Sequence, residues 1–317
     1  MKAITCHDHG SRDVLQYEEI EKPIPDDNQV LIKVCAASVN PLDGFPVLVA
    51  RLSRFTSWLR KPKISRLGTD VAGRIEAVGA KATRFKPGDE VFGVCLGAFA
   101  EYVCTAERNL IQKPANTSFE QAAAVPVAAI TALQALRDKG NIHPGQKVLI
   151  DGASGGVGTY TLQLAKCFGA EVTATCSTRN VDIARRLGAD IIIDYTAEDF
   201  ARTGKRYELI MAANGHHSLF AYLRALTKDG TLVMVGGGLF QIIQAMLLGP
   251  LFSRMSSKKV RMFIAQINQP DLLLLKDLLE TGKLVSIIDK SYPLSQTAEA
   301  LRYRDQGHAR GKVIVTL

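Results

Sequence analysis

The sequence of 317 residues has few cysteines, and no two of them form a CxxC pair. The six are scattered along the chain at Cys6, Cys35, Cys95, Cys104, Cys167 and Cys176. This usage is typical of reduced thiols in a protein core, and it gives no support to a disulfide framework. We therefore expect a protein of a reducing compartment.

Long apolar runs are also missing, since no window reaches the ~18 residues that a membrane-spanning helix needs. The longest candidate, Leu239–Phe252, is interrupted by Gln241, Gln244 and Gly249-Pro250. The chain begins Met-Lys and is polar by His7, so no signal-peptide stretch is expected at its start. Together with the cysteine usage, these absences predict a cytoplasmic location.

The composition is that of an ordinary globular protein, with 47% hydrophobic and 22% charged residues, which excludes disorder, collagen and simple coiled coil. The 39 basic and 31 acidic residues leave a net charge of +8 with both signs interspersed. This balance favours anionic ligands, but alone it is weak evidence for nucleic-acid binding. The length fits two domains or one large α/β unit.

The first third of the chain has the pattern of short strands separated by turns, for example Gln29–Ala36, Val71–Gly79 and the turn Lys86–Asp89. We expect a β-rich domain over residues 1–122. The apolar strand Lys312–Thr316 is expected to return to it, so residues 290–317 complete this domain.

Residues 123–289 are expected to form a second domain, in which strands and helices alternate from Gln146 onward. The expected strands are Lys147–Ile150, Glu171–Cys176, Ile191–Ile193, Leu209–Ala213 and Thr231–Val235. The expected helices are Val157–Phe168, Val181–Leu187 and Leu219–Leu226, the first two ended by Gly169 and Gly188. The alternation predicts a doubly wound parallel sheet, with Ile191–Ile193 buried on both faces.

A glycine-rich turn follows the first of these strands, in the segment Asp151–Gly158. Its spacing Ala153-x-Gly155-x-x-Gly158 is the dinucleotide-binding fingerprint with alanine in place of the first glycine. At such a turn, backbone amides and the helix N-terminus hold a pyrophosphate. We expect Ser154, Gly155, Gly156 and Val157 to bind it; the alternative is a merely structural turn.

The end of the next strand indicates which dinucleotide is bound. An NAD site has an acidic residue there, whereas this strand is followed by Ser177 and Arg179, with no carboxylate before Asp182. A hydroxyl beside a guanidinium suits a 2′-phosphate, and Tyr195 is expected at the same sheet edge. The sequence therefore favours NADPH; the alternative is that Ser177 and Arg179 cap the following helix and face solvent.

Several motifs together resemble the zinc-independent quinone oxidoreductase branch of the medium-chain dehydrogenases/reductases. They are the glycine-rich turn, Cys176–Asn180, Ser38–Asp43, Gly68–Gly73, Pro87–Gly93 and Gly307–Lys312. The resemblance runs nearly end to end. It implies a GroES-like catalytic domain around an inserted Rossmann domain, hydride transfer from NADPH to a quinone or an α,β-unsaturated carbonyl, and a homodimer.

Metal ligands are absent where zinc-dependent relatives carry them. Asn40 stands where a cysteine would be and Thr69 where a histidine would be, the four close cysteines of a structural zinc lobe are missing, and the histidines are dispersed. We expect no metal site, which weakens the case for an alcohol dehydrogenase that stabilises an alkoxide with zinc.

Further candidate site residues follow partly from their own chemistry and position in the chain and partly from the resemblance. Asn40 is expected to donate from its amide to the acceptor carbonyl and Asp43 to orient it, although the segment also has ordinary turn composition. Thr131 matches a position facing the cofactor, or is a core hydroxyl bonded to its own helix. Asn214 and Gly236–Gly238 follow successive strand ends, where ligands of such sheets bind. Gly236 and Gly237 are expected to approach the nicotinamide ribose, while the role of Asn214 is left open. Arg310 and Lys312 are further cofactor-binding candidates. His216 and His217 are expected to be exposed loop residues.

Two basic segments suggest that the protein contacts a partner larger than a small-molecule substrate. Residues 51–66 carry six basic and no acidic side chains among apolar ones, and Leu239–Phe252 is followed by Arg254, Lys258, Lys259 and Arg261. These patterns suit peripheral membrane contact, or else a solvated lid and a buried dimer or pocket helix. No nucleic-acid partner is expected. Two further functions stay open: an NADP-dependent alcohol dehydrogenase, and a non-enzymatic dinucleotide-binding protein with RNA or membrane contacts.

Overall fold

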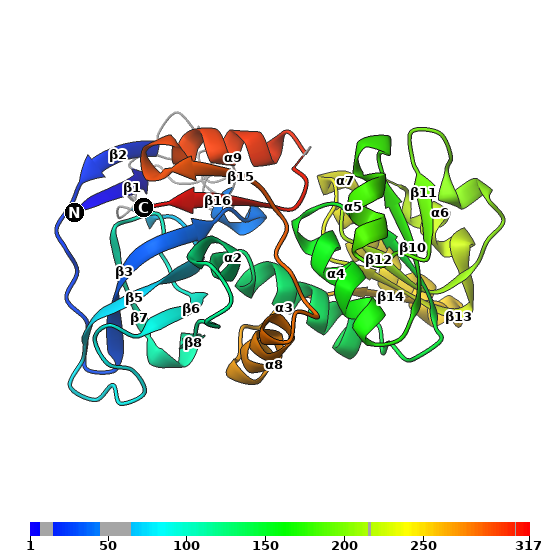
Figure 1. Ribbon diagram of the computed structural model, residues 1–317. Helices are drawn as coiled ribbons and strands as arrows, with labels where there is room; N and C mark the ends of the chain where they lie inside the picture. Colours follow the sequence, from blue (N-terminus) through cyan, green and yellow to red (C-terminus); the bar gives the residue numbers. More distant parts are fainter. Residues whose placement is uncertain (7–14, 45–64, 215–216, 308) are drawn as a thin grey trace. The chain divides into compact units, whose positions relative to one another are not determined.

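The chain folds into two compact units (Figure 1). The computed structural model describes residues 1–6, 15–44, 65–214, 217–307 and 309–317. The first unit comprises residues 1–127 and 267–317, and the second comprises residues 128–266. Both ends of the chain belong to the first unit (Figure 1). The second unit is therefore an insertion, and the β-rich plus doubly wound α/β organisation expected from the sequence is confirmed.

The first unit is built from two sheets. The larger has seven strands, in the order β15-β16-β3-β5-β6-β8 with β7 also paired to β3, and the smaller has the order β2-β1-β4. The strands are β1 (Lys2–Cys6), β2 (Leu15–Glu19), β3 (Gln29–Ser38), β4 (Ser65–Arg66), β5 (Asp70–Val78), β6 (Glu90–Val94), β7 (Tyr102–Ala106), β8 (Leu110–Gln112), β15 (Ile288–Pro293) and β16 (Lys312–Thr316).

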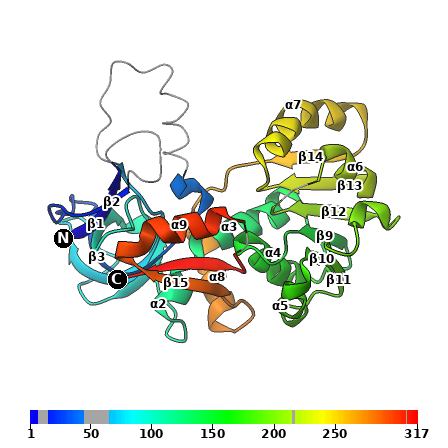
Figure 2. The same ribbon diagram turned by 90° about the horizontal axis from the view of Figure 1, so that it is seen from above.

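The C-terminal strand β16 lies between β15 and β3, as Figure 2 shows for β15. It runs antiparallel to β3 with Ile314 opposite Ser38, and the amide of Val39 donates to the carbonyl of Val313 at 2.9 Å. The prediction that the last strand returns to the first domain is confirmed. This pairing brings Lys312 beside the end of β3.

Among its described residues, the first unit has the helices α2 (Phe119–Ala123), α8 (Gln269–Glu280) and α9 (Thr297–Asp305). The amide of Asn116 donates to the carbonyls of Leu279 and Glu280, at 3.3 and 3.1 Å, which ties α8 to this unit. The sequence analysis placed residues 123–127 and 267–289 in the other domain. An amphipathic helix pattern does not tell which of two cores the helix covers, and this explains the difference.

The second unit contains one parallel sheet with the strand order β11-β10-β9-β12-β13-β14. The strands are β9 (Lys147–Asp151), β10 (Glu171–Cys176), β11 (Ile191–Asp194), β12 (Tyr207–Ala212), β13 (Leu226–Met234) and β14 (Lys259–Met262). The helices are α4 (Gly156–Cys167), α5 (Val181–Arg186), α6 (Leu219–Ala225) and α7 (Leu239–Met255), while α3 (Pro126–Gln134) crosses from the first unit.

The chain moves outward from β9 in both directions, so right-handed crossovers place α4 and α5 on one face of the sheet and α6 and α7 on the other. Gly169 and Gly188 end α4 and α5 with φ of +77° and +99°, as their positions predicted. The expectation that Ile191–Ile193 is buried on both faces is wrong for Ile191 and Ile192. β11 is an edge strand, and only Ile193 of the three is buried.

No two of the six cysteines form a disulfide, and Cys95 and Cys176 are buried. The expectation of core thiols is wrong for Cys167, the last residue of α4, which is exposed, and Cys6, Cys35 and Cys104 are only partly buried. Among the helices of the described residues, none has the length and hydropathy needed to cross a membrane.

Candidate active site

The glycine-rich turn joins β9 to α4 at the carboxyl edge of the parallel sheet. Gly152 has φ +82°, and a Cβ there would lie 2.8 Å from Cβ of Asn214. A Cβ on Gly158 would lie 2.1 Å from the carbonyl oxygen of Gly152, so glycine at 158 lets α4 pack tightly on the turn. These two glycines are required by the fold of the turn itself.

Gly155 differs, because a Cβ there would meet only the carbonyl oxygen of Gly152, at 3.6 Å. The space beside its backbone is open, as expected where a ligand approaches the chain closely. Gly155 is also the N-cap of α4, with no side-chain cap, and the first turn of the helix carries no acidic residue. The turn thus presents amides and the positive end of a helix dipole, which fits a pyrophosphate.

A buried carboxylate that the sequence analysis did not single out anchors this turn. The Oδ1 of Asp151 accepts from the hydroxyl of Thr175 at 2.6 Å, and its Oδ2 accepts from the hydroxyl of Tyr222 at 2.5 Å. The Thr175 hydroxyl oxygen in turn accepts from the amide of Gly152 at 3.1 Å. Burial and the neighbouring Asp151 raise the pKa of Tyr222. The network joins β9, β10 and α6 behind the turn, and the sequence gives no signal for it because its partners are distant.

The end of β10 presents the residues expected to recognise a 2′-phosphate. Ser177 is buried, while Arg179 and Tyr195 are exposed. The amide of Tyr195 donates to the carbonyl of Cys176 at 3.0 Å, so Tyr195 lies at the same sheet edge, as predicted. Asp182, the next carboxylate along the chain, is exposed and pairs with Arg185 at 3.0 Å.

Asn180 connects the two parts of this edge, and the sequence analysis did not include it among the site residues. Its side-chain amide nitrogen donates to the hydroxyl oxygen of Ser154 at 2.9 Å and to that of Ser177 at 3.1 Å. Ser154 belongs to the glycine-rich turn and Ser177 follows β10. The structure therefore brings together two predicted site residues that are 23 positions apart (177 less 154).

The neighbouring strand ends carry the other predicted residues of this unit. Asn214 follows β12 and packs on Gly152, and its backbone N–H donates to the backbone carbonyl of Asp151 at 3.3 Å. After β13, a Cβ on Gly236 would lie 2.4 Å from the carbonyl oxygen of Ala213, and Gly237 has φ +148°. All three lie at the carboxyl edge of the sheet, beside the turn; their contact with the cofactor stays a prediction.

The remaining predicted residues of the second unit lie elsewhere or behave differently. Thr131 is half-buried on α3. His216 lies outside the described residues. His217 is not the exposed loop residue that was expected: its ring packs edge-on against Phe200, with centroids 4.5 Å apart, and 29% of its side chain is exposed.

In the first unit, a buried polar network surrounds Asn40. The ammonium of Lys312 donates to Oδ1 of Asn40 at 2.7 Å and lies 3.5 Å from Oδ2 of Asp70. The amide nitrogen of Asn40 donates to the same Asp70 oxygen at 2.8 Å and to the carbonyl of Ser38 at 3.4 Å. Lys312 is 3% and Asp70 0% exposed. Burial lowers the pKa of Lys312, and the carboxylates of Asp70 and Asp43 raise it.

Asp43 forms the second layer of this network, in the 3-10 turn Pro41–Gly44. Its Oδ2 accepts from the backbone amide of Asn40 at 2.7 Å, which closes the turn, and its Oδ1 accepts from the hydroxyl of Thr69 at 2.9 Å. Burial raises the pKa of Asp43 to about 6 in spite of both hydrogen bonds. The orienting and turn-capping role expected of Asp43 fits these contacts, while Asn40 contacts Lys312 and Asp70 in addition.

Arg310 and Lys312 were predicted to bind the cofactor. The backbone amide of Arg310 donates to Oδ2 of Asp289 at 2.9 Å, and Lys312 is committed to Asn40 and Asp70. Both residues belong to the first unit, whereas the glycine-rich turn belongs to the second. Their part in cofactor binding stays a prediction.

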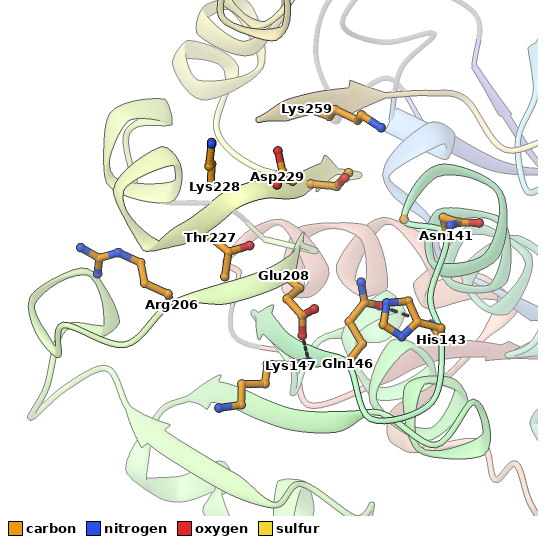
Figure 3. A pocket seen from close by; sticks show the side chains of 12 residues that line it. Asn141, His143, Gln146, Lys147, Arg206, Glu208, Thr227, Lys228, Asp229 and Lys259 are labelled. Carbon is orange, nitrogen blue, oxygen red and sulfur yellow. Dashed lines mark hydrogen bonds between the residues drawn. The ribbon is translucent and has the colours of Figure 1, made fainter. Parts of the chain in front are cut away.

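A hollow of about 810 Å³ lies at the opposite, amino-terminal edge of the same sheet (Figure 3). It is lined by Lys147, Glu208 and Lys259 at the beginnings of β9, β12 and β14, by Thr231 within β13, and by other side chains that include charged ones. The amide of Lys147 donates to Oε2 of Glu208 at 2.9 Å. Because ligands of doubly wound sheets bind at the carboxyl edge, this hollow is separate from the candidate cofactor site.

A GroES-like β-rich unit that carries a buried polar network, with an inserted Rossmann unit that carries a dinucleotide turn, defines a medium-chain dehydrogenase/reductase. The alcohol dehydrogenase GroES-like domain model matches residues 26–115, and the zinc-binding dehydrogenase model matches residues 187–315.

Whole-chain comparisons narrow this class. The chain is 33% identical to a chloroplastic quinone-oxidoreductase homolog of Spinacia oleracea, covering 96% of this chain and 95% of the relative. It is 33% identical to a chloroplastic NADPH-dependent alkenal/one oxidoreductase of Arabidopsis thaliana, over 99% and 79% of the two chains. The solved quinone oxidoreductase from Coxiella burnetii is 31% identical, with a TM-score of 0.88 over 100% and 99%. The chain belongs to the quinone oxidoreductase family of the medium-chain dehydrogenases/reductases.

Proposed function

We propose that this protein is an NADPH-dependent reductase that transfers hydride to a quinone or an α,β-unsaturated carbonyl without a catalytic metal. The observation that carries the proposal is the carboxyl edge of the parallel sheet. There, a dinucleotide turn with open space beside Gly155 lies next to a strand end that carries Ser177 and Arg179 in place of a carboxylate. The curated relatives named above support the substrate class.

The residues present fit NADPH. The α4 N-terminus and the turn amides would hold the pyrophosphate, and Ser177, Arg179 and Tyr195 would hold the 2′-phosphate through hydroxyl and guanidinium donors. When bound, NADPH supplies the hydride from C4 of its nicotinamide. The chain contributes position, since quinones and enones are already electrophilic and need contact with the nicotinamide more than activation.

Zinc independence is supported by the contacts of Asn40 and Thr69, the two residues that stand where zinc-dependent relatives have ligands. The amide of Asn40 is hydrogen-bonded to Asp70, and the hydroxyl of Thr69 to Asp43. Neither side chain offers the thiolate or imidazole that a catalytic zinc site requires. Within the described ranges, no three histidine, cysteine or acidic side chains cluster as a metal site would.

Asn40 is the candidate donor to the acceptor oxygen. Among the described residues, its second amide proton has only the carbonyl of Ser38 as acceptor, at a long 3.4 Å, so this proton can be given to a substrate carbonyl at little cost. The Lys312 ammonium on its Oδ1 polarises the amide and makes it a stronger donor. As hydride arrives, the developing oxyanion would be stabilised by this fixed donor.

The experiment that tests the proposal offers the purified protein three substrates separately, while NADPH absorbance is followed. They are a small quinone, an alkenal or enone with NADPH, and a simple alcohol with NADP. We expect oxidation of NADPH with a quinone or enone, and retention of activity after dialysis against a chelator. Turnover only of the alcohol would indicate an alcohol dehydrogenase, and binding of NADPH without turnover of any substrate would indicate a non-enzymatic dinucleotide-binding protein.

We further propose that α7 contacts an anionic membrane surface. Its outer face carries a stripe of exposed apolar side chains at a spacing of three or four residues, namely Phe240, Ile243, Leu247, Leu251 and Met255. Its inner face packs on the core through Ala245, Leu248 and Phe252. A helix that is apolar on both faces needs a further partner.

Charge favours a bilayer over a second copy of the chain. Residues 230–270 contain four basic and no acidic residues, and Arg224 and Arg254 are exposed on α6 and α7. In a two-fold contact the same patch meets itself, so these arginines would face like charges with no carboxylate in the segment to balance them. Anionic headgroups supply the missing charge, and a lipophilic quinone would be drawn from the same surface. The other basic segment, residues 51–66, lies almost entirely outside the described residues.

A further inference from the structure

Asn180 is almost completely buried, with 4% exposed, yet one of its polar atoms has no partner. Its Nδ2 donates to Ser154 and Ser177, and its Oδ1 accepts no hydrogen bond from any described residue. A buried carbonyl oxygen without a donor is costly. The reverse orientation of the amide would give this oxygen two donors, but it would leave both amide protons without acceptors.

In the reverse orientation, Oδ1 would accept from both serine hydroxyls and Nδ2 would be left with two unpaired protons. That orientation consumes both hydroxyl protons and buries two unsatisfied donors in place of one acceptor. In the orientation found, both serine oxygens are acceptors toward Asn180. Their own protons must then point away from Asn180, and among the described residues neither proton has an acceptor.

The two hydroxyls lie where the dinucleotide phosphates are expected. Ser154 belongs to the turn that faces the pyrophosphate, and Ser177 follows β10, where a 2′-phosphate is expected. We propose that Asn180 is a positioning residue that turns the hydroxyl protons of Ser154 and Ser177 outward as donors to the nucleotide phosphates, and so contributes to the preference for NADPH over NADH. This inference rests on the proposed dinucleotide site.

The position of Asn180 also sets the spacing between the two phosphate subsites. Its backbone amide donates to the carbonyl of Ser177 at 2.8 Å, which fixes the 3-10 turn Thr178–Asn180 to the strand end. The side chain then reaches across to the glycine-rich turn. An aspartate of the same shape has no amide protons and two acceptor oxygens, so it would draw both serine protons inward and add a negative charge beside the phosphates.

The test compares the dissociation constants of NADPH and NADH, measured by fluorescence titration, for the wild-type protein and for Asn180→Asp, Asn180→Ala, Ser177→Ala and the double variant Asn180→Asp/Ser177→Ala. We expect Asn180→Asp to raise the dissociation constant of NADPH by about 100-fold and that of NADH by about 10-fold. The difference arises because only NADPH loses the contact of Ser177 with a charged group. Asn180→Ala, which frees the hydroxyls without reversing them, is expected to weaken NADPH by about 10-fold.

The double variant separates positioning from a general structural role. If Asn180 acts through the Ser177 hydroxyl, adding Ser177→Ala to the Asn180→Asp variant should reduce the affinity for NADPH little further. The effects of the two substitutions on this affinity are then strongly non-additive. Equal weakening of NADPH and NADH, or additive effects, would overturn the proposal. Should Asn180→Asp not fold, as judged by circular dichroism, the Asn180→Ala and Ser177→Ala pair gives the same comparison. Failure of the wild-type protein to bind either nucleotide would instead overturn the dinucleotide site itself.

Discussion

The ammonium of Lys312 and the amide oxygen of Asn40 are 2.7 Å apart, although the two residues are 272 positions apart in the chain. The pairing of β16 with β3 creates this contact at the end of the larger sheet of the first unit. Both side chains are buried, and Asp70 neutralises the ammonium from 3.5 Å. One strand pairing thus places a fixed positive charge behind the residue proposed to polarise the substrate.

Replacing Lys312 by methionine is expected to destabilise the protein by about 3–5 kcal/mol, because it leaves the carboxylate of Asp70 buried without its counter-ion. The kcat with an enone is expected to fall by about tenfold or more, since Asn40 loses the group that holds and polarises it. Urea unfolding and steady-state kinetics measure the two effects.

The exposed Lys86, in the same unit, supplies the matched control Lys86→Met, which should change neither quantity. The double variant Asp70→Asn/Lys312→Met removes both charges and is expected to recover much of the lost stability without recovering kcat. A stability loss as small as that of Lys86→Met would show that the buried pair is not important to the fold.

The raised pKa of Asp43 leads us to expect a specific pH dependence of the free energy of unfolding. Its pKa is about 6 in the folded protein against 3.8 when solvated, so between these values the folded state binds the proton more tightly. Its contribution to stability is therefore full below about pH 4 and is lost as the pH rises through 6. The free energy of unfolding should fall by up to about 3 kcal/mol over this range from this group alone.

The measurement is urea unfolding of the wild-type protein and of Asp43→Asn at several pH values from 4 to 8. The difference between the two free energies isolates the titration of Asp43 from that of other groups. A difference that does not vary with pH would mean that Asp43 does not titrate in this range.

Arg179 is expected to decide between the two nucleotides. Arg179→Ala should weaken the binding of NADPH by about 1.5–3 kcal/mol, the value of one hydrogen bond to a charged group. The affinity for NADH should stay nearly unchanged. Isothermal titration measures both affinities. Arg185→Ala, which removes a neighbouring exposed arginine paired with Asp182, should alter neither. Equal losses for both nucleotides would assign Arg179 a structural role.

The α7 stripe predicts salt-sensitive binding to anionic vesicles. The wild-type protein should sediment with vesicles of anionic lipid at low salt and less at high salt, since headgroup attraction is screened. Leu247→Gln, at a position that is 72% exposed, should reduce sedimentation without changing stability, whereas the exposed Leu273→Gln on α8 serves as the control. Absence of vesicle binding together with concentration-dependent self-association lost in Leu247→Gln would identify a second copy of the chain as the partner.

Much of the second unit could be predicted from the sequence, because its signals are local. Glu171–Cys176 forms a strand with the predicted bounds, and helix α4 starts one residue before the predicted Val157. The glycines at 152 and 158 have the conformations and contacts that a dinucleotide turn requires. Periodicity and turn chemistry need no knowledge of distant residues.

What the sequence did not reveal depends on distant pairing. The ion pair of Lys312 with Asp70, the anchoring of Asp151 by Tyr222, and the link from Asn180 to Ser154 join residues with no common motif. The placement of α8 failed for the same reason, as its apolar face fits either core. The edge position of β11 likewise follows from strand order, which periodicity does not encode.

The central claim is direct transfer of hydride from NADPH to the substrate without a metal ion, and isotopic labelling tests it most directly. Protein stripped of metal with a chelator would be given NADPH deuterated at C4 of the nicotinamide, on the transferred face, together with an enone, and the product examined by mass spectrometry. We expect one deuterium at the β-carbon of the saturated product per turnover. A product without deuterium, or turnover that returns only when zinc is added, would contradict the account.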